Sequence, residues 1–483
     1  MSLWTGYEIA EATGGYATRD FEVTQVSIDS REISKGALFI ALKDRRDGHE
    51  FVASALKAGA AGALVSEIPP DVPKDAPLVV VSDTFQALRA LGHAGRMRTK
   101  AKVIGVTGSV GKTGTKEMLR QMLAGQGRVH AAYKSFNNHW GVPLTLARMP
   151  RETEFAVIEI GMNAPGEIAP LADLAQLDVA MITTVAPVHI ENFENIEGIA
   201  HEKASILSGL KAGGVAVLPC DVGTYPILEA RAERGGFKAI TFGESEAAAY
   251  RLQSVRVASG ATLVDAQLSD RPILFRIGAP GRHLATNALG ALAAVAAAGA
   301  DPTKAALALG QWEAPEGRGA RWRIDLGEGA IDGAILLIDD AYNANPTSLA
   351  ASLETFVDVE PQHGIGRVSK GRRVAFLTDM LELGKHGYAM HAEIATLPTL
   401  AKIDRVHCAG PLMKALYDAL PPQKRGHWFA EAEGLAKRAP KLVDAGDVAL
   451  VKGSKGSRAA RVVEALKDIG QAVRADDFAD GET

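Results

Sequence analysis

Residues 103–113 read Val-Ile-Gly-Val-Thr-Gly-Ser-Val-Gly-Lys-Thr, an apolar strand that runs into a glycine-rich turn. Apolar residues recur at helical spacing from Met118 to Leu123, so a helix is predicted directly after the turn. This context is typical of a phosphate-binding loop, because glycines let backbone N–H groups face phosphates and a helix N-terminus favours anions. We expect the Lys112 ammonium to reach the terminal phosphates and the Thr113 hydroxyl to ligate Mg²⁺.

The loop departs from the strict phosphate-loop pattern at one position, where Val106 stands in place of the first glycine and Gly108 follows two residues later. The competing interpretation is a tight turn that carries an exposed lysine. We favour the phosphate loop because both flanking elements are predicted. A GTPase switch is disfavoured, because the chain contains neither Asn-Lys-x-Asp nor Asp-x-x-Gly. The residues expected around the nucleotide phosphates are Thr107, Gly108, Ser109, Val110, Gly111, Lys112 and Thr113.

The bulk composition is that of a globular protein with several domains. The chain has 483 residues, of which 47% are apolar and 23% charged, and its net charge is −4. It is too long for one hydrophobic core and too apolar for disorder, so about three domains are expected. The net charge provides no basic surface in bulk, which argues against nucleic-acid binding.

Cysteine content and apolar runs bear on the compartment. Cys220 and Cys408 lie far apart and in no metal-binding spacing, so a reducing compartment is expected and not a disulfide framework. The N-terminus lacks a basic start followed by an apolar stretch, which argues against a signal peptide. The most apolar run, residues 288–300, is short and rich in Ala and Gly, typical of a buried helix and not of a membrane span. We therefore expect a cytoplasmic protein.

Short apolar strands alternate with helices along most of the chain. Near-continuous apolar strands after residue 103 predict a parallel sheet with helices on both faces. Residues 250–277 break this rhythm and are predicted to be an antiparallel insertion. The alternation restarts after Pro315, so domain boundaries are expected near residues 100 and 313. The predicted strands are 36–42, 63–65, 78–81, 103–106, 155–160, 179–185, 215–218, 334–338, 373–377, 405–408 and 448–451.

Two polar residues follow predicted strands of the central sheet. Glu159 ends the strand Phe-Ala-Val-Ile-Glu, and His189 lies in the loop after the next strand. Ligands of open α/β sheets bind outside the carboxyl ends of the strands, where both residues should lie. A solvated glutamate and a loop histidine are the alternative interpretation, and neither residue decides between the two by itself.

Lys203 is the more informative residue, because it lies on an apolar helical stripe. The segment 199–210 has apolar residues at helical spacing, and Lys203 is four residues after Ile199 and four before Leu207. An inward-facing ammonium is unfavourable without a partner. The side chain can snorkel to solvent. Alternatively it is carbamylated, and the resulting anionic oxygens join Glu159 and His189 around Mg²⁺, which prefers oxygen ligands.

The order of these residues along nearly the whole chain resembles the Mur ligase family. The matching positions are 107–113, Glu159, His189, Lys203, Asn287, Arg318 and Asp340. Four stretches are similar to members that add D-alanyl-D-alanine: Phe136-Asn-Asn-His-Trp-Gly-Val-Pro-Leu-Thr-Leu146, Asp339-Asp-Ala-Tyr-Asn-Ala-Asn-Pro346, Thr378-Asp-Met-Leu-Glu-Leu-Gly384 and Leu450-Val-Lys-Gly-Ser454. The Asp-Asn-Pro-Arg motif of the diaminopimelate-adding members does not occur in the sequence.

The resemblance implies an α/β fold of three domains. Residues 1–100 would bind the UDP-sugar end of the substrate, residues 101–312 would form the P-loop domain that binds ATP, and residues 313–483 a Rossmann-like ligase domain. The implied activity is an ATP-dependent ligase that joins D-alanyl-D-alanine to UDP-N-acetylmuramoyl tripeptide through an acyl phosphate, with Mg²⁺ as cofactor. We expect no nucleic-acid partner and no membrane span, and we expect the protein to be a monomer.

The resemblance also implies roles for single residues. Lys112 would contact the β and γ phosphates and Thr113 the first Mg²⁺, while Glu159, His189 and a carbamylated Lys203 would surround the second. The nucleotide would further contact Asn287 near adenine, and Arg318 and Asp340 at the junction of the second and third domains. The positions implied for the other substrates are Ser30 and Arg31 at the sugar end, Asn343 and Asn345 near the dipeptide, and also Asn137 and Asn138.

Two alternatives stay open on the sequence. One is another ligase of the same superfamily, of the diaminopimelate-adding or folylpolyglutamate type. The other is a nucleotide-dependent switch or a binding module without catalysis. A screen of acceptors distinguishes the first alternative from a ligase that adds D-alanyl-D-alanine. Stoichiometric ATP turnover with substrate excludes the second alternative.

Overall fold

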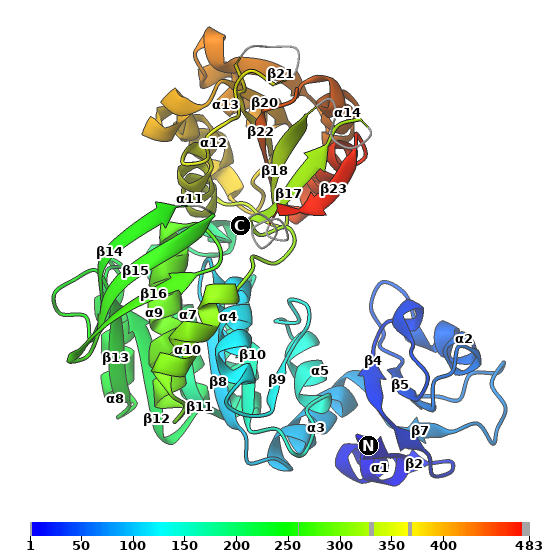
Figure 1. The fold of residues 1–483 in the computed structure, drawn as a ribbon. Coiled ribbons are helices and arrows are strands. Elements are labelled where there is room, and N and C mark those ends of the chain that lie inside the picture. Colours follow the sequence, from blue (N-terminus) through cyan, green and yellow to red (C-terminus); the bar gives the residue numbers. More distant parts are fainter. Residues whose placement is uncertain (1, 259, 328–332, 366–369, 476–483) are drawn as a thin grey trace.

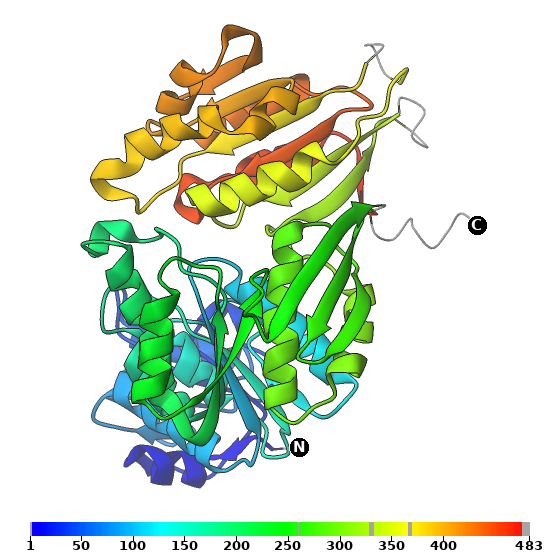
Figure 2. The ribbon, with the colours of Figure 1, turned by 90° about the vertical axis from the view of Figure 1, so that its left-hand side faces the viewer.

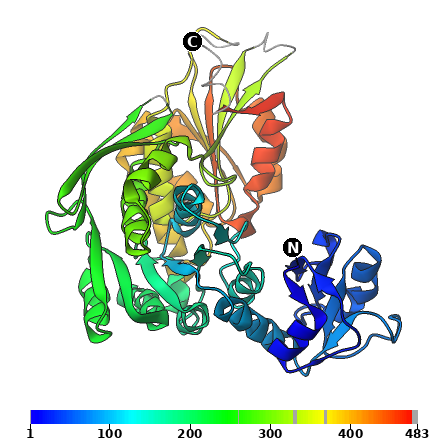
Figure 3. The same cartoon turned by 60° about the horizontal axis from the view of Figure 1, so that its bottom comes forward.

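The computed structural model describes residues 2–258, 260–327, 333–365 and 370–475. Within these residues the chain forms three α/β domains in a row, each with its own main sheet (Figure 1). The C-terminal domain stands on the central domain, and the N-terminal domain lies beside the central domain, apart from the C-terminal one (Figure 3). The predicted three-domain α/β fold is therefore confirmed.

The central sheet has the strand order β16-β15-β14-β13-β12-β11-β8-β10-β9. All neighbours from β14 to β9 pair in parallel, and only the pairs β14–β15 and β15–β16 are antiparallel. The predicted antiparallel segment thus exists, but it extends the central sheet. The strands are β8 (Lys102–Thr107), β9 (Val129–Ala131), β10 (Phe155–Glu159), β11 (Leu177–Ile182), β12 (Leu210–Pro219), β13 (Lys238–Gly243), β14 (Tyr250–Ala258), β15 (Ala261–Leu268) and β16 (Arg271–Ile277).

Helices cover both faces of this sheet, because successive strand residues point to opposite faces. Ile104 and Val106 pack into one core with the helices at residues 112–124 and 282–297. Val103 packs into the other core, with the helices at residues 168–175 and 196–204. Figure 2 shows these layers beneath the C-terminal domain. The helices are α4 (Lys112–Ala124), α5 (Gly141–Ala147), α6 (Ile168–Ala175), α7 (Ile196–Ala204), α8 (Tyr225–Arg234), α9 (Arg282–Ala297) and α10 (Pro302–Ala308).

The N-terminal domain is built on a sheet in the order β2-β7-β6-β5-β4. Its strands β4, β5, β6 and β7 pair in parallel, and β1 and β3 form a separate antiparallel pair. The elements are β1 (Trp4–Thr5), α1 (Gly6–Thr13), β2 (Tyr16–Ala17), β3 (Glu22–Val23), β4 (Gln25–Ser27), β5 (Ala37–Ile40), α2 (Val52–Lys57), β6 (Gly62–Val65), β7 (Leu78–Val80) and α3 (Thr84–Met97).

The C-terminal sheet has the order β21-β20-β19-β22-β18-β17-β23. Its predicted strands β18, β19, β20 and β22 are parallel and buried. The strands β17, β21 and β23 were not predicted, because charged or other polar residues leave them with only short apolar runs. The elements are β17 (Ala320–Asp325), β18 (Ala334–Asp340), α11 (Pro346–Val357), β19 (Arg373–Thr378), α12 (Gly387–Glu393), β20 (Arg405–Ala409), α13 (Met413–Ala419), β21 (Arg425–Phe429), α14 (Ala432–Arg438), β22 (Val448–Lys452), α15 (Ala460–Lys467) and β23 (Gln471–Arg474).

Two further sequence expectations concern membrane spans and cysteines. Of the helices in the described parts of the chain, none has the length and hydropathy needed to cross a bilayer. Cys220 is half-buried and Cys408 is buried, and both are free thiols.

The helix α3 joins the first two domains and packs very closely on α5. A Cβ on Gly95 would lie 2.3 Å from the Leu146 carbonyl oxygen, and one on Gly92 would lie 2.7 Å from the Pro143 carbonyl oxygen. Both contacts are with backbone, which cannot move aside as a flexible side chain can. The glycines therefore set the distance between the two helices.

We expect Gly95→Ala to lower the thermal unfolding midpoint. Alanine favours a helix over glycine by about 1 kcal/mol, but overpacking against rigid neighbours destabilises by about 1–3 kcal/mol. The matched control is Gly198→Ala in α7, where a new Cβ would meet its nearest atom at 3.5 Å. Scanning calorimetry should show a lower midpoint for Gly95→Ala and no loss for Gly198→Ala. Equal stability of Gly95→Ala and the wild type would contradict the close packing.

Candidate active site

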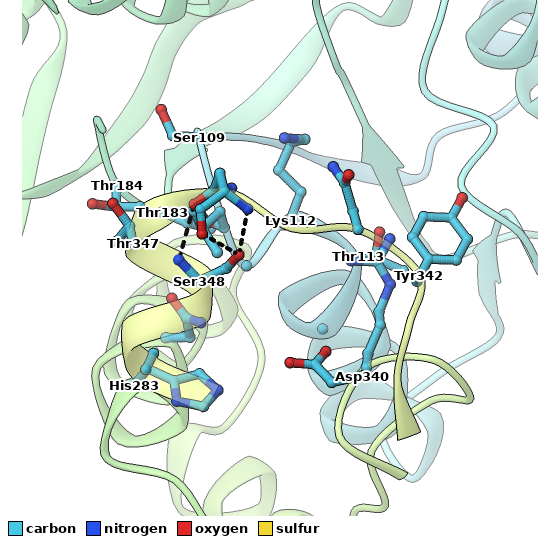
Figure 4. A pocket seen from close by; sticks show the side chains of 18 of the residues that line it. Ser109, Lys112, Thr113, Thr183, Thr184, His283, Asp340, Tyr342, Thr347 and Ser348 are labelled. Atoms are coloured by element: carbon cyan, nitrogen blue, oxygen red, sulfur yellow. Dashed lines mark hydrogen bonds between the residues drawn. The ribbon is translucent and has the colours of Figure 1, made fainter. Parts of the chain in front are cut away.

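A cavity of about 780 Å³ lies between the central and C-terminal domains. In Figure 4, Lys112 and Thr113 reach it from the central domain, while Asp340 and Tyr342 reach it from the C-terminal domain. Lys112, Glu159 and His189 lie at or just after the carboxyl ends of β8, β10 and β11, respectively. These ends lie together because the three strands are parallel neighbours.

Most of the residues singled out in the sequence line this cavity. Five do not line it, namely Thr107, Gly108, Lys203, Ser30 and Arg31. Those that do are Ser109, Val110, Gly111, Lys112, Thr113, Asn137, Asn138, Glu159, His189, Asn287, Arg318, Asp340, Asn343 and Asn345.

The phosphate loop depends on two glycines. Gly108 has φ 151° and Gly111 has φ 87°, both in the region that favours glycine. A Cβ on Gly108 would come within 1.9 Å of the Thr183 hydroxyl oxygen, so no other residue fits there. Val106, the departure from the strict pattern, is still inside β8 and fully buried in the core, where a glycine is not required.

Lys112 is the first residue of α4 and stands at the mouth of the loop. Its Nζ donates to the Gly108 carbonyl oxygen at 2.6 Å. Burial is the main cause that lowers its pKa, nearby Arg318 lowers it further, and Glu159 opposes the shift. The ammonium is thus held by a backbone carbonyl, a weak partner that an anionic phosphate can replace.

Thr113 and Glu159 form a buried hydrogen-bonded pair beneath the loop. The Thr113 hydroxyl lies 3.0 Å from each Glu159 carboxylate oxygen and 2.8 Å from the Ser135 hydroxyl oxygen. The Asn137 amide donates to Glu159 Oε1 at 2.7 Å. Glu159 is only 2% exposed, and in the described parts of the chain it forms no ion pair with a lysine, arginine or histidine. A buried carboxylate whose hydrogen-bond partners are neutral is a site that a cation would stabilise.

His189 faces the C-terminal domain. It adopts the left-handed conformation with φ 57°, and its Nδ1 lies 2.7 Å from Glu382 Oε2, although the two groups are not aligned as a hydrogen bond. Metal-binding histidines commonly turn their second ring nitrogen to a carboxylate. With Nδ1 beside Glu382, Nε2 is the nitrogen left for a ligand in the cavity.

Lys203 is buried, as its place on the apolar stripe predicts, with 2% of its surface exposed. The helix is shorter than expected: α7 ends at Ala204, a 3-10 helix covers Ser205–Gly209, and Leu210 begins β12. The nearest partner of Nζ is the Met162 sulfur, at 3.9 Å. Burial first, and then repulsion from Lys112, lowers the Lys203 pKa well below its usual value, against the attraction of Glu202. Snorkelling to solvent is therefore excluded.

The C-terminal domain brings positive and negative groups to the cavity. The Arg318 guanidinium lies over the Tyr342 ring at 4.2 Å and donates to the Ser135 hydroxyl at 3.3 Å, so it bridges the two domains. The Asp340 carboxylate accepts from Lys452 Nζ at 2.7 Å, and the same ammonium donates to the Asn343 carbonyl oxygen at 3.0 Å. Lys452 is 2% exposed and thus fixes the turn that follows β18.

Two predicted asparagines have structural partners of their own. Asn345 caps α11, since its side-chain oxygen accepts from Ser348 N at 2.9 Å, so its amide nitrogen is the group left for a ligand. Asn287 on α9 lies against the phosphate loop, where a Cβ on Gly111 would come within 2.7 Å of its side-chain nitrogen.

The predicted sugar-side residues lie in the N-terminal domain, outside the cavity. Arg31 is exposed and pairs with Asp29 at 2.6 Å. The next residue, Glu32, accepts from the Tyr133 hydroxyl at 2.9 Å and from Lys134 Nζ at 2.6 Å, which connects this turn to the central domain.

Sequence reasoning missed three residues that shape the site. Ser135 contacts both Thr113 and Arg318, Glu382 contacts His189, and Lys452 holds Asp340. Glu382 and Lys452 lie inside stretches that the resemblance had already marked. Ser135 directly precedes such a stretch but carries no pattern of its own.

Comparisons with known proteins agree with this arrangement. Family models match at residues 22–95 (Mur ligase family, catalytic domain), 106–295 (Mur ligase middle domain) and 322–455 (Mur ligase, glutamate ligase domain). The chain is 34% identical to the UDP-N-acetylmuramoyl-tripeptide–D-alanyl-D-alanine ligase of Bacillus subtilis over 91% of this chain and 92% of that protein. It is also 34% identical to the Escherichia coli ligase of that name, over 93% of this chain and 95% of the relative.

Solved structures give the same result. The MurF structure from Acinetobacter baumannii superposes with a TM-score of 0.80 at 27% identity and covers 96% of this chain and 99% of its own. The Thermotoga maritima MurF ligase in complex with ADP superposes with a TM-score of 0.74 at 25% identity, over 92% of this chain and 98% of its own. The phosphate loop, the buried Glu159 and the full-length similarity together show that the chain belongs to the Mur ligase family, among the UDP-N-acetylmuramoyl-tripeptide–D-alanyl-D-alanine ligases.

Proposed function

We propose that this chain is an ATP-dependent ligase that joins D-alanyl-D-alanine to UDP-N-acetylmuramoyl tripeptide through an acyl phosphate. One observation carries the proposal: Lys112, Thr113 and Glu159 meet in a cavity to which the C-terminal domain adds Arg318 and Asp340. The relatives that carry this activity in their names span more than nine-tenths of the chain, at 91% and 93%.

The reaction needs an activated carboxyl group, because a carboxylate is a poor electrophile. Transfer of the γ-phosphoryl group of ATP to the tripeptide's terminal carboxylate gives an acyl phosphate. The dipeptide amine attacks its carbonyl carbon, the C–O bond breaks, and phosphate leaves with the electron pair. Lys112 and Arg318 would stabilise negative charge on the transferring group from the two domains. Approach of the domains excludes water, which otherwise hydrolyses the intermediate.

The chain's own residues fit Mg²⁺. Thr113 would hold one ion through its hydroxyl, and Glu159, His189 and a carbamylated Lys203 would hold a second. In the described ranges no three His, Cys, Asp or Glu side chains cluster as a metal site; the modified lysine would supply the second site with a third protein ligand. When bound, Mg²⁺ supplies charge neutralisation at the phosphates.

Carbamylation of Lys203 is supported by its surroundings. A neutral, desolvated amine is the form that reacts with CO₂, and burial lowers the pKa of Lys203 well below its usual value. Repulsion from Lys112 acts in the same direction. Conversion of the neutral amine to a carbamate places an anion near Lys112, so the two side chains attract each other and the repulsion of two ammonium groups is avoided.

The substrates can be assigned to the three domains. Residues 1–100 would hold the UDP-sugar end through Ser30 and Arg31, and residues 101–312 would bind ATP, with adenine near Asn287. Residues 313–483 would present the dipeptide. The ADP bound by the Thermotoga maritima relative supports nucleotide binding. The side chains proposed to contact the tripeptide are Asn137 and Asn138, and those for the dipeptide are Asn343 and Asn345.

We propose a cytoplasmic monomer as the active form. The nucleotide substrates are cytoplasmic metabolites, and both thiols of the chain are free. The central and C-terminal domains of a single chain supply the residues proposed to bind ATP and the dipeptide.

Loss of the Lys112 charge should abolish phosphate release. Lys112→Ala removes a cation aimed at the transferring group, and loss of one such contact lowers kcat by about 100- to 1000-fold. Phosphate release with ATP, UDP-muramoyl tripeptide and D-alanyl-D-alanine measures the effect. Lys238→Ala, at an exposed lysine of the same domain, should act like the wild type. Near-normal turnover in a folded Lys112→Ala protein would exclude the phosphate-loop assignment.

The acceptor should be the dipeptide. With tripeptide and ATP, D-alanyl-D-alanine should drive turnover, whereas free diaminopimelate or lysine should not. The stretch Tyr342-Asn-Ala-Asn-Pro346 and the missing Asp-Asn-Pro-Arg motif motivate this expectation. A panel of acceptors in the phosphate assay tests it. Preference for a single diamino acid would move the chain to the neighbouring branch of the family.

Lys203 should be carbamylated in the active protein. Lys203→Ala should lose most activity, and short carboxylic acids such as acetate should restore part of it by filling the ligand position. Lys203→Arg keeps a charge but leaves no space, so acetate should not restore it. Removal of bicarbonate should weaken the wild type and leave Lys203→Ala unchanged. Mass spectrometry or electron density that shows an unmodified Lys203 in the active, Mg²⁺-bound protein would overturn the assignment.

A further inference from the structure

Lys116 is a fully buried lysine in the same domain that neither the phosphate loop nor the metal site explains. It lies one helical turn after Lys112 on α4 and has 0% exposure. Its Nζ donates to the Ala132 carbonyl oxygen at 2.5 Å and to the Lys134 carbonyl oxygen at 3.3 Å. The Glu117 carboxylate, 2.8 Å away, is its ion-pair partner.

A buried cation of this kind is poorly explained by stability. Well-packed apolar residues in place of a buried ion pair often leave a protein equally stable or more stable. The partner Glu117 is itself partly exposed and also pairs with Arg120 at 2.7 Å. The backbone segment that Lys116 binds therefore indicates its role better than its ion pair does.

That group is the segment 132–138, which we call the bridge segment. It follows β9 and carries Ser135 and Asn137 to the site. Ser135 lies 2.8 Å from the Thr113 hydroxyl, and the Asn137 amide donates to Glu159 at 2.7 Å. The Asn137 carbonyl oxygen also accepts from Gly161 N at 2.8 Å, just beyond β10. The two proposed metal ligands are thus oriented by one segment.

The bridge segment has a second anchor, on the N-terminal domain. Glu32 binds the side chains of Tyr133 and Lys134. The side chains of Lys134 and Glu32 are 52% and 44% exposed, and exposed ion pairs contribute little because water screens them. Lys116 instead binds backbone carbonyls on both sides of Tyr133, and its own side chain has no exposed surface, so these bonds are stronger than exposed ones. The buried anchor therefore dominates.

We propose that Lys116 is a positioning residue of the ligase reaction, which holds the bridge segment so that Ser135 and Asn137 orient Thr113 and Glu159. The expected effect of Lys116 on turnover rests on the proposed ligase function. Its expected effect on the bridge segment rests on the contacts alone. Without the ammonium, the Ala132 carbonyl oxygen loses this buried hydrogen bond, the Lys134 carbonyl oxygen keeps only the one from Phe136 N at 2.9 Å, and the segment loosens. The Thr113 hydroxyl and the Glu159 carboxylate then lose their fixed orientation, although neither is changed.

The test compares Lys116→Met with Arg96→Met. Methionine keeps the length and apolar volume of the side chain and removes the ammonium. Arg96 is the matched control, since it is 4% exposed and donates to the carbonyl oxygens of Ala175 and Gln176, remote from the bridge segment. Both variants lose a buried cation that binds two carbonyls. A purely structural role would give both the same phenotype.

The first readout needs no substrate. Amide hydrogen exchange should rise in the bridge segment and at Gly161 in Lys116→Met and stay at the wild-type rate there in Arg96→Met. The second readout is turnover: outer partners of metal ligands change affinity or activity by about 10- to 100-fold. For Lys116→Met we expect kcat to fall and the half-saturating Mg²⁺ concentration to rise, each by about tenfold, with an unchanged KM for D-alanyl-D-alanine.

A double-mutant cycle shows whether Lys116 acts through the segment. In a Ser135→Ala, Asn137→Ala background, Lys116→Met should lower kcat much less than in the wild type, because the groups it positions are gone. Additive losses would overturn the proposal, and so would wild-type exchange of the bridge segment in Lys116→Met. If Lys116→Met does not fold, Lys116→Gln is measured in the same way, and failure of both while Arg96→Met folds would show a structural role.

Failure of the proposed ligase function can be distinguished from failure of the Lys116 proposal. A wild-type protein that releases no phosphate with tripeptide, ATP and any acceptor would refute the ligase assignment. The exchange comparison between Lys116→Met and Arg96→Met would still test whether Lys116 holds the bridge segment.

Discussion

The buried carboxylate of Glu159 is the group on which the rest of the site depends. It ends a central strand, is 2% exposed, and has the Thr113 hydroxyl and the Asn137 amide as its partners. Removal of an ionised carboxylate from water is very unfavourable without compensating charge. Two positive groups of the site lie near it, Lys112 at the helix N-terminus and Arg318 across the domain junction. The two cations proposed for Thr113 and for Glu159 would add to this compensating charge.

The junction between the central and C-terminal domains is also made by charged and polar groups. Arg318 reaches back from the C-terminal domain to Ser135, and Glu382 reaches His189. These contacts are few and polar, in contrast to the apolar cores within each domain. Interfaces of this kind permit relative motion of domains. A ligase that must exclude water during turnover and release a large product needs such motion. The Thr113–Glu159 pair and the bridge segment both belong to the central domain.

A large part of the fold could be predicted from the sequence, because its buried parallel strands are near-continuous apolar runs. Those runs gave the strands β8, β10, β18, β19 and β22, and the glycine turn gave the phosphate loop. The strands β17, β21 and β23 were missed because charged or other polar residues leave them with only short apolar runs; β21 and β23 lie at the edges of the sheet. The apolar spacing around Lys203 correctly indicated burial, but it could not show that the helix changes to 3-10 geometry at Ser205.

The sequence by itself determined the family, the phosphate loop and the burial of Lys203, because each depends on a local pattern or a spacing along the chain. The tertiary structure alone decided which groups meet. Ser135 touches Thr113 and Arg318, although Arg318 is 183 residues away, and Lys116 holds the backbone that carries Ser135. Contacts of this kind arise because parallel strands bring distant loops to one edge of the sheet. The spacing of apolar residues along the sequence does not show which loops meet there.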